Sequence, residues 1–327
     1  MHLLLFNIYD SIRALGWHGA FELLRDGIIL GSLYSLVALG YTMVYGILKL
    51  LNFAHGDVFM VGAFMGFGVL SSLGGPLNPI LGTVPLLIVM FLVAMIGTGV
   101  LGVVIERFAY RPLRNAPRIA PLISALGVAF FLESSVQLLT NSAHSQYLFY
   151  PVFNTLHTAA FTLNIEGVTE PVTYMALLII GSAIVLMLGL MFLVNRTQLG
   201  KAMRATAFDR EAANMMGINT DRVISATFFI GSALAGAAGV MYGLQYSDVY
   251  YLVGFTFGLK AFTAAVVGGI GSIEGAMLGG ILIGVVEVFA VGYAGGQWSD
   301  IAVFGLLIAF LLVRPTGILG KHAIQKV

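Results

Sequence analysis

NRTQLGKAMRATAFDREAANMMGINTDR, residues 195–222, is the longest polar interruption with a helical pattern in a chain that is otherwise mostly apolar. Within it, Thr206 and Asp209 have the spacing of a capping box, with a hydroxyl at the N-cap and an acid three residues later. A short helix is therefore expected to begin at Thr206. Gly217 stands where a glycine in a left-handed conformation can end that helix.

The side chains of this short segment divide into two faces. Charged and amide residues fall on one face, while apolar residues recur at i, i+4, i+7 and i+8 on the other. The apolar positions are Phe208, Ala212, Met215 and Met216. The pattern predicts an amphipathic helix of about three turns. Such a helix either lies on a lipid surface or docks a soluble partner, and the rest of the chain has to decide between the two.

The whole chain has the composition of a membrane protein. Hydrophobic residues make up 59% of its 327 residues, charged residues make up 9%, and the mean hydropathy is +0.96. A soluble globule is excluded, because soluble domains carry about 25% charged residues. The net charge of +1 gives no sign of a nucleic-acid partner, and the lack of cysteine excludes disulfides and thiolate metal sites.

Several apolar runs have about the 20 residues that a bilayer requires. The expected spans are 27–48, two spans within the uncharged run 58–105, then 119–139, 172–194, a run from 222 to 246, and two or three shorter pieces up to 314. The sequence GGPLNP at 74–79 is expected to form the turn between the two spans of the uncharged run. Residues 1–22 are expected to be a retained N-terminal extension that can form an interfacial helix.

Basic residues indicate which loops share one side of the membrane. Four Lys and Arg lie in 107–118, five in 196–222 and three in 314–326, whereas 141–171 has none. Because basic loops face the cytoplasm, an even number of crossings must separate each pair of these segments. Two spans separate the first pair, and either two spans with a re-entrant pair or four crossings fit the second. Three spans before Arg107 would place the N-terminus outside, whereas Arg13 and Arg25 favour the inside.

We therefore predict an all-α, polytopic transmembrane bundle of about eight to ten spans with broken or re-entrant helices. Residues 23–320 would form a single transmembrane domain, with 195–222 as a cytoplasmic loop and 321–327 as a cytoplasmic tail. Small residues spaced by four predict faces where helices approach closely. These stripes are Gly27 and Gly31, Gly231 to Gly243, and Gly275 and Gly279.

The sequence contains no motif of an enzyme. No P-loop is present, the glycines at 268–275 miss the dinucleotide-binding spacing, and no HExxH, GxSxG or Cys/His cluster occurs. We therefore expect no catalytic residue, no bound cofactor and no metal site in this chain.

Polar residues within apolar surroundings are the candidates for a transport path. Asn52, His55 and Asp57 fall within six residues, between a span and an uncharged run. Polar groups there are costly unless they face a cavity or a partner, and broken helices line the substrate paths of transporters. An ordinary interfacial loop is the other interpretation. Glu133 and Glu287 lie inside apolar runs, and each either borders a path or pairs with a neighbouring helix.

Several stretches carry a family resemblance. They are GSLYSL at 31–36 through Gly46 into LNFAHGD at 51–57, LGKAMRA at 199–205 with Asp209, EAA at 211–213 and MGI at 216–218, VGGIGSIEGA at 267–276, and RPTGILG at 314–320. Together they resemble the Liv-type permeases of bacterial branched-chain amino acid ABC importers. The resemblance covers nearly the whole chain from about residue 23, and residues 1–22 have no clear counterpart.

The resemblance implies a permease subunit of the bacterial inner membrane that is not itself an enzyme. Its partners would be a second permease of the same family, two cytoplasmic ABC ATPase subunits that use the ATP, and a periplasmic solute-binding protein. The positions that correspond to the coupling helix, the motif that contacts the ATPases, are Asp209, Glu211, Ala212, Ala213 and Gly217. Related permeases carry urea and short amides, so the cargo stays open between these and branched-chain or other apolar amino acids.

Other classes of function remain as alternatives. In an ion-coupled secondary transporter or channel, Glu133 and Glu287 would be proton or cation sites. A purely structural membrane anchor would need none of these polar residues. In the leading hypothesis, an ABC importer, Asn52, His55 and Asp57 would border the substrate path.

Overall fold

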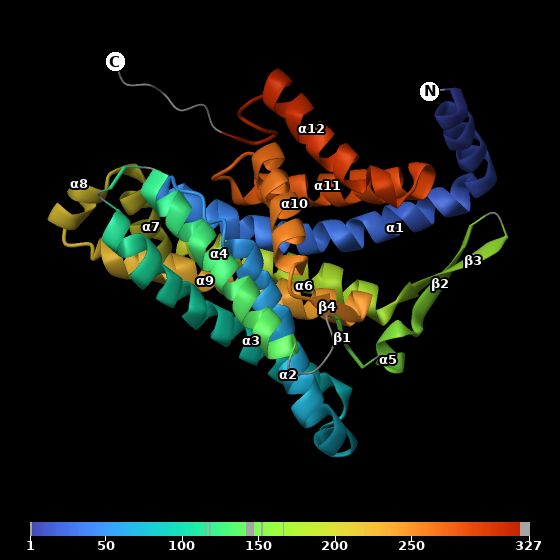
Figure 1. Cartoon of the computed structure of the whole chain (residues 1–327), viewed down its shortest axis with the longest axis horizontal. Helices are drawn as coiled ribbons and strands as arrows, with labels where there is room; N and C mark the ends of the chain where they lie inside the picture. The colour runs from blue at the N-terminus through green and yellow to red at the C-terminus, as the bar shows by residue number, and fades with distance from the viewer. Residues whose placement is uncertain are drawn as a thin grey trace.

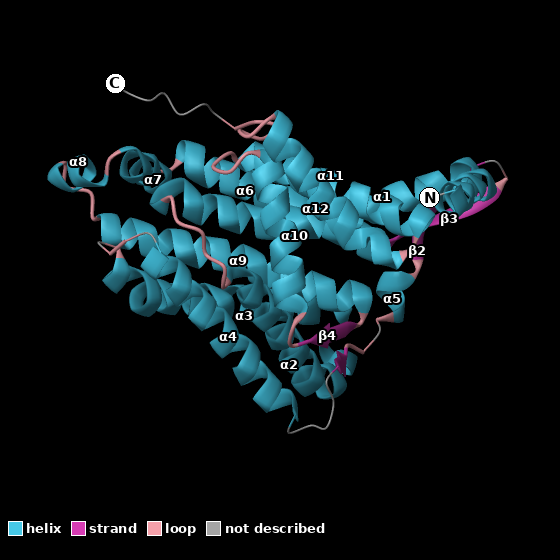
Figure 2. Cartoon of the chain, turned by 45° about the horizontal axis from the view of Figure 1, so that its top comes forward, coloured by secondary structure: helices cyan, strands magenta, loops and turns pink. Residues whose placement is uncertain are grey.

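The chain folds into a bundle of long helices with short strands at one end (Figures 1 and 2). The computed structural model describes residues 2–320 except 115, 118, 142–146, 152 and 166. Among these residues, eight helices are long and apolar enough to cross a membrane, and one further apolar helix, α10, is shorter. The predicted all-α bundle of about eight to ten spans is thus confirmed. Arg118 and the predicted tail 321–327 lie outside the described residues.

Three of the four described strands lie between α4 and α6 in the chain. In chain order the elements are α1 (His2–Leu48), α2 (His55–Leu81), α3 (Thr83–Ile105), a π-helical turn (Glu106–Tyr110), a 3-10 turn (Arg111–Leu113), α4 (Ile119–Asn141), β1 (Tyr147–Phe149), α5 (Asn154–His157), β2 (Ala159–Ile165), β3 (Val168–Thr173), α6 (Tyr174–Arg196), α7 (Gln198–Phe208), α8 (Arg210–Met215), α9 (Thr220–Tyr246), β4 (Asp248–Tyr250), α10 (Val253–Gly268), α11 (Ile273–Ala294), a 3-10 turn (Gly296–Trp298) and α12 (Ser299–Val313).

Helix α1 is the central element, and it packs along α11 and against α9 and α10. Glycines let the backbones approach: a Cβ on Gly31 would lie 2.6 Å from the Ile281 Cα atom. Similarly, a Cβ on Gly239 of α9 would lie 2.6 Å from the Ala63 nitrogen of α2. The predicted small-residue stripes are therefore contact faces. Helices α3, α4, α6 and α12 instead expose many large apolar side chains on the outside of the bundle.

The two ends of the bundle differ. Helices α7 and α8 lie at one end, and the antiparallel hairpin β2–β3 lies at the other (Figure 1). Arg111 and Arg114 form ion pairs with Asp221, so the loop after α3 and the loop before α9 share the α8 end. This agrees with the even number of crossings expected between the two basic loops. At the other end, Arg25 of α1 donates to the Pro171 carbonyl at 2.9 Å, which holds the hairpin against α1.

The course of α10 accounts for the crossings after α9. β4, which lies between α9 and α10, pairs with β1, and β1 belongs to the segment that leads from α4 to the β2–β3 hairpin. From there α10 runs to Gly268, where Leu319 donates to the Gly268 carbonyl and Ile318 to the Val267 carbonyl, at 3.0 and 2.9 Å. The segment after α12 therefore meets the end of α10. Of the two arrangements open from the sequence, this favours four crossings, with α10 as a short one of about 24 Å.

The turn expected at residues 74–79 is wrong. Helix α2 continues through this stretch to Leu81, and the chain turns at Gly82, which has a φ of 70°. Glycine and proline are tolerated within helices that span a membrane, whereas the turn needs the left-handed conformation that glycine adopts without strain. Residues 2–22 form the first part of α1, which continues to Leu48.

Candidate functional site

Helix α8 begins at Asp209, and the expectation that it begins at Thr206 is wrong. Thr206 is buried within α7, where its hydroxyl donates to the Ala202 carbonyl at 2.8 Å. Asp209 is instead the N-cap, because its carboxylate accepts the Ala212 N–H at 3.0 Å. The acid of the apparent capping box thus caps a second helix, and α7 and α8 meet at that residue.

The end of α8 agrees with the sequence-based expectation. Gly217 has a φ of 85°, and the N–H groups of Gly217 and Ile218 donate to the carbonyls of Asn214 and Ala213 at 3.0 and 3.1 Å. This pair of bonds is the Schellman motif that ends helices at a left-handed glycine. Helix α8 is therefore fixed at both ends by its own sequence.

The side chains of α8 present an exposed surface. Ala213 is buried, whereas Met215 and Met216 are 82% and 83% exposed, and Glu211 is exposed as well. Phe208, expected on the same helical face, is exposed but belongs to the last turn of α7. The predicted single helix of three turns is thus divided between α7 and α8. Three of its apolar side chains, Phe208, Met215 and Met216, lie on the surface.

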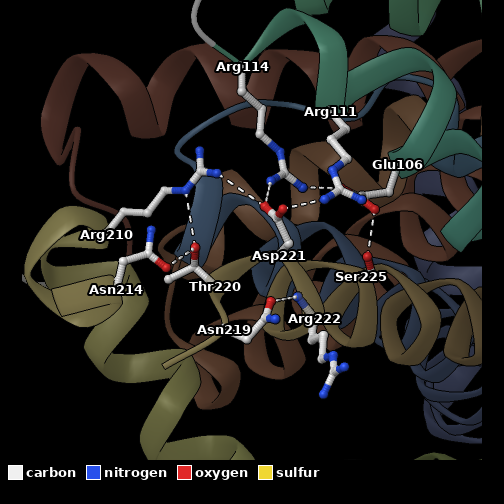
Figure 3. A network of polar contacts seen from close by, with 10 residues as sticks. All are labelled: Glu106, Arg111, Arg114, Arg210, Asn214, Asn219, Thr220, Asp221, Arg222 and Ser225. Atoms are coloured by element: carbon white, nitrogen blue, oxygen red, sulfur yellow. Dashed lines mark hydrogen bonds and ion pairs between the residues drawn. The ribbon is translucent and has the colours of Figure 1, made fainter. Parts of the chain in front are cut away.

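A network of charged residues joins α8 to the ends of α3 and α9 (Figure 3). Arg114 donates to Asp221 at 2.6 Å and Arg210 of α8 donates to the same oxygen at 3.3 Å. Arg111 pairs with the other Asp221 oxygen. Asp221 therefore contacts three cations from two separate parts of the chain.

A second acid extends the network toward the bundle. Glu106 pairs with Arg114 and accepts the Ser225 hydroxyl of α9 at 2.7 Å. The side chains of Glu106 and Arg114 are only 1% and 5% exposed. Because separating one partner from a buried ion pair is strongly destabilising, these contacts make a firm joint between α3 and α9. Sequence reasoning missed Glu106, Arg114 and Asp221, although an acid directly before a basic loop was a visible signal.

The break between α1 and α2 gathers the polar residues predicted at 52–57. Lys49 has a φ of 55° just after α1, and α2 starts at His55. Asn52, His55 and Asp57 are at most 2% exposed. The Tyr110 hydroxyl lies 3.1 Å from both the Asn52 Oδ1 and the Leu51 carbonyl, which anchors the non-helical segment. The interpretation as an ordinary interfacial loop does not fit this degree of burial.

Glu133 joins this cluster from α4. It is 8% exposed and interacts electrostatically with Asp57. It also lines a cavity of about 30 Å³ together with Tyr41 and Gly258. Among the described residues, His55 Nε2 and Asp57 Oδ1 are buried without a hydrogen-bond partner. Buried polar atoms are nearly always paired, so the cluster has unused capacity for water or a passing solute.

Glu287 lies in a different place from the other four candidates. It accepts the Tyr34 hydroxyl at 2.7 Å and pairs with Lys260 of α10 at 2.6 Å. Helix α10 separates the two clusters: Gly254 and Gly258 face the α2 start, where a Cβ on Gly254 would lie 2.7 Å from Asp57 Oδ1. Lys260 is on the other side. Glu287 is thus paired with side chains of two neighbouring helices, and its place beside a transport path stays a prediction.

Comparison with known proteins identifies the class. Residues 23–312 match the family model described as branched-chain amino acid transport system / permease component. The chain is 44% identical over 311 residues to the high-affinity branched-chain amino acid transport system permease protein BraD of Pseudomonas aeruginosa, covering 93% of this chain and 97% of that protein. It is 42% identical over 308 residues to LivH of Escherichia coli strain K12, covering 92% and 96%.

More distant relatives and the solved structures complete the comparison. The chain is 27% identical over 210 residues to the inner membrane ABC transporter permease protein YjfF of Escherichia coli, covering 62% of this chain and 61% of that protein. No solved structure matches the chain. As a permease component, the chain is a non-catalytic, multi-pass membrane subunit of an ABC transport system, in which ATP is handled by partner subunits. The chain belongs to the family of branched-chain amino acid transport system permease components.

Proposed function

We propose that this permease carries branched-chain or other apolar amino acids across the inner membrane, driven by two ATPase subunits, one of which docks at α8. A second permease of the same family and a periplasmic solute-binding protein complete the importer. The observation that carries this proposal is α8 itself, an exposed helix fixed at both ends and lying where the basic loops gather. The names of the relatives BraD and LivH support the cargo.

The charged network gives α8 a route to the membrane helices. Movement of α8 acts on Arg210, which contacts Asp221 at the start of α9. Asp221 in turn holds Arg111 and Arg114, just after α3. Both α3 and α9 pack on α2, the helix that begins with the buried polar cluster. ATP-driven movement at the surface thereby reaches the residues around the break between α1 and α2.

The buried cluster is the part of the proposed path that this chain contributes near α2. Asn52, His55 and Asp57 come from one stretch of the chain and Glu133 from another, and some of their polar atoms have no partner among the described residues. The ATPases and the binding protein would shift the permease between inward and outward states by binding each state differently. A path bordered by half-helix ends suits a solute with charged termini.

Coupling is tested in proteoliposomes that contain the permeases and both ATPases, with the binding protein added. We expect Gly217→Val to retain ATP hydrolysis but to lose at least about tenfold in leucine uptake, because a β-branched residue is strained at a φ of 85°. Gly217→Asn is the matched control, since asparagine tolerates this conformation. Normal uptake by Gly217→Val would remove α8 from the coupling path. Full uptake without any ATPase subunit would overturn the proposed function.

A further inference from the structure

A cavity lies on the side of α10 that faces away from the start of α2, and the proposed coupling of ATP hydrolysis to uptake gives it no role. It has a volume of about 470 Å³ and lies between α1, α9, α10 and α11. Cavities of about 300–1,000 Å³ are typical of small-molecule sites. It is separate from the buried cluster at the start of α2, because none of Asn52, His55, Asp57 or Glu133 lines it.

The cavity combines charges of both signs. Lys260, Glu287 and Asp26 all line it. Lys260 is the only Lys or Arg between Arg222 and Arg314, and its side chain is 13% exposed. Charged side chains within a membrane domain are costly and usually mark a functional site.

The remaining lining suits an aliphatic group. Leu23 and Leu30 of α1, Val253 of α10, and Val288 and Val291 of α11 contribute apolar surface. Removing such surface from water stabilises a bound aliphatic group. Tyrosine rings complete the wall, and their faces attract cations such as an ammonium group. These are Tyr34, Tyr242 and Tyr246.

The contacts of Lys260 show how a ligand can enter. Its three N–H donors go to Glu287 at 2.6 Å, Ser299 at 2.8 Å and Asp300 at 2.9 Å. The Glu287 partner is buried, but the Asp300 side chain is 70% exposed. Because the Asp300 carboxylate is already mostly in contact with water, it is the partner that a ligand carboxylate can replace at the lower cost.

From this arrangement we propose that the cavity is a binding site for a zwitterionic α-amino acid with an aliphatic side chain. Lys260 binds the carboxylate in place of Asp300, Asp26 and Glu287 receive the ammonium group, and the valines and leucines enclose the side chain. Tyr34 and Ser299 position Glu287, because both donate to its carboxylate at 2.7 Å. This inference rests on the proposed function and names the place where the cargo pauses within this subunit.

The test measures binding of radiolabelled L-leucine to the purified transporter complex in nanodiscs, without ATP and without the binding protein. Unlabelled L-leucinamide, which lacks the carboxylate, and 4-methylpentanoate, which lacks the amine, serve as competitors. We expect saturable leucine binding and at least tenfold weaker competition by each analogue. In Lys260→Met, leucine binding falls and leucinamide competes as well as leucine.

A second cavity variant and two control variants separate recognition from folding. Glu287→Gln is expected to abolish discrimination against 4-methylpentanoate, because the amide no longer attracts the ammonium group as a charge. The matched control for this change is Glu274→Gln, an exposed carboxylate outside the cavity. Lys201→Met on α7 is the corresponding control for Lys260→Met. Both controls are expected to bind leucine as the unchanged complex does.

The site and the proposed function fail in different ways. Lack of saturable leucine binding to the unchanged complex overturns the site, as does unchanged discrimination in both Lys260→Met and Glu287→Gln. Loss of ATP-driven uptake in the unchanged complex would instead overturn the proposed function. If the single variants do not assemble, the competition pattern of the unchanged complex decides, because a site occupied by lipid would not distinguish leucine from leucinamide.

Discussion

Asp221 is the residue at which the contacts of the α8 end converge. It is 37% exposed, in contrast to the buried Glu106–Arg114 pair beside it. The difference separates two roles. Removing the charge of Glu106 would break its buried pair with Arg114 and destabilise the fold. Removing the charge of Asp221 leaves that buried pair in place, and the other two arginines of Asp221, Arg111 and Arg210, are 43% and 39% exposed and accessible to water. Asp221 is therefore the position where communication can be interrupted without unfolding the protein.

Asp221→Asn tests this difference. We expect the variant to assemble at normal levels, because Arg114 keeps its buried partner Glu106 and the other contacts of Asp221 are partly exposed. Leucine uptake should fall about tenfold, equivalent to about 1.4 kcal/mol in coupling, while ATP hydrolysis continues. Uptake and hydrolysis are measured on the same proteoliposomes. The control is Glu22→Gln, which changes an acid on α1 beside Arg25, at the hairpin end of the bundle. Uptake equal to that of the control would show that α8 acts by another route.

At the level of elements, the close contact of α2 with α10 holds the two polar clusters apart. Gly56 and Gly258 meet without side chains, and a Cβ on Gly258 would lie 2.7 Å from the Gly56 Cα atom. The same stretch of α10 faces Asp57 with Gly254 and the larger cavity with Lys260. A change in the spacing of α2 and α10 therefore affects both clusters.

Gly258→Ala should destabilise the bundle. The added methyl group has no room, and overpacking of this kind costs typically about 1–3 kcal/mol. The thermal stability of the detergent-solubilised complex, followed by size-exclusion chromatography after heating, is expected to fall by several degrees. Gly127→Ala on α4 is the matched control, because nothing lies within 4 Å of a Cβ there. An equal shift in both variants would argue against close packing as the cause.

The sequence predicted the spans better than their ends. Hydropathy identifies membrane helices because the bilayer acts uniformly on every residue that faces it. The ends depend on single hydrogen bonds. The spacing of Thr206 and Asp209 was correct for a capping box, but Thr197 already caps α7 by accepting the Gly200 N–H at 3.1 Å. Thr206 is therefore inside a helix, and only the three-dimensional pairing shows which cap is used.

The candidate site was predictable in part for a similar reason. Asn52, His55, Asp57 and Glu133 stood out because polar residues in apolar surroundings are rare. That Glu287 belongs elsewhere could not be read from the chain, because its partner Lys260 lies 27 residues away on another helix. The contacts of Asp221 were hidden for the same reason, because Arg111 and Arg114 lie 110 and 107 residues away in the chain.

For the whole molecule, the placement of α8 and the β2–β3 hairpin at opposite ends (Figure 1) predicts that they lie on opposite sides of the membrane. Because the chain has no cysteine, single cysteines report position directly. Thr162→Cys on β2 should react with a membrane-impermeant maleimide in intact spheroplasts. Met215→Cys on α8 should react only after permeabilisation. Both positions are exposed in the subunit, so poor access within the protein would not explain a difference. Labelling of Met215→Cys in intact spheroplasts would reverse the orientation of the bundle.

The pairing of α1 with α11 has a consequence for how the protein is made. Helix α1 finds its most extensive partner in a helix that is synthesised more than 220 residues later. Until then, the glycine-lined face of α1 has no matching surface, and contacts of such long sequence separation form slowly. The hydrogen bonds at the end of α10 also form late, because their donors are the backbone N–H groups of Ile318 and Leu319. The pairing of α1 with α11 therefore forms only after the helices between them have been made.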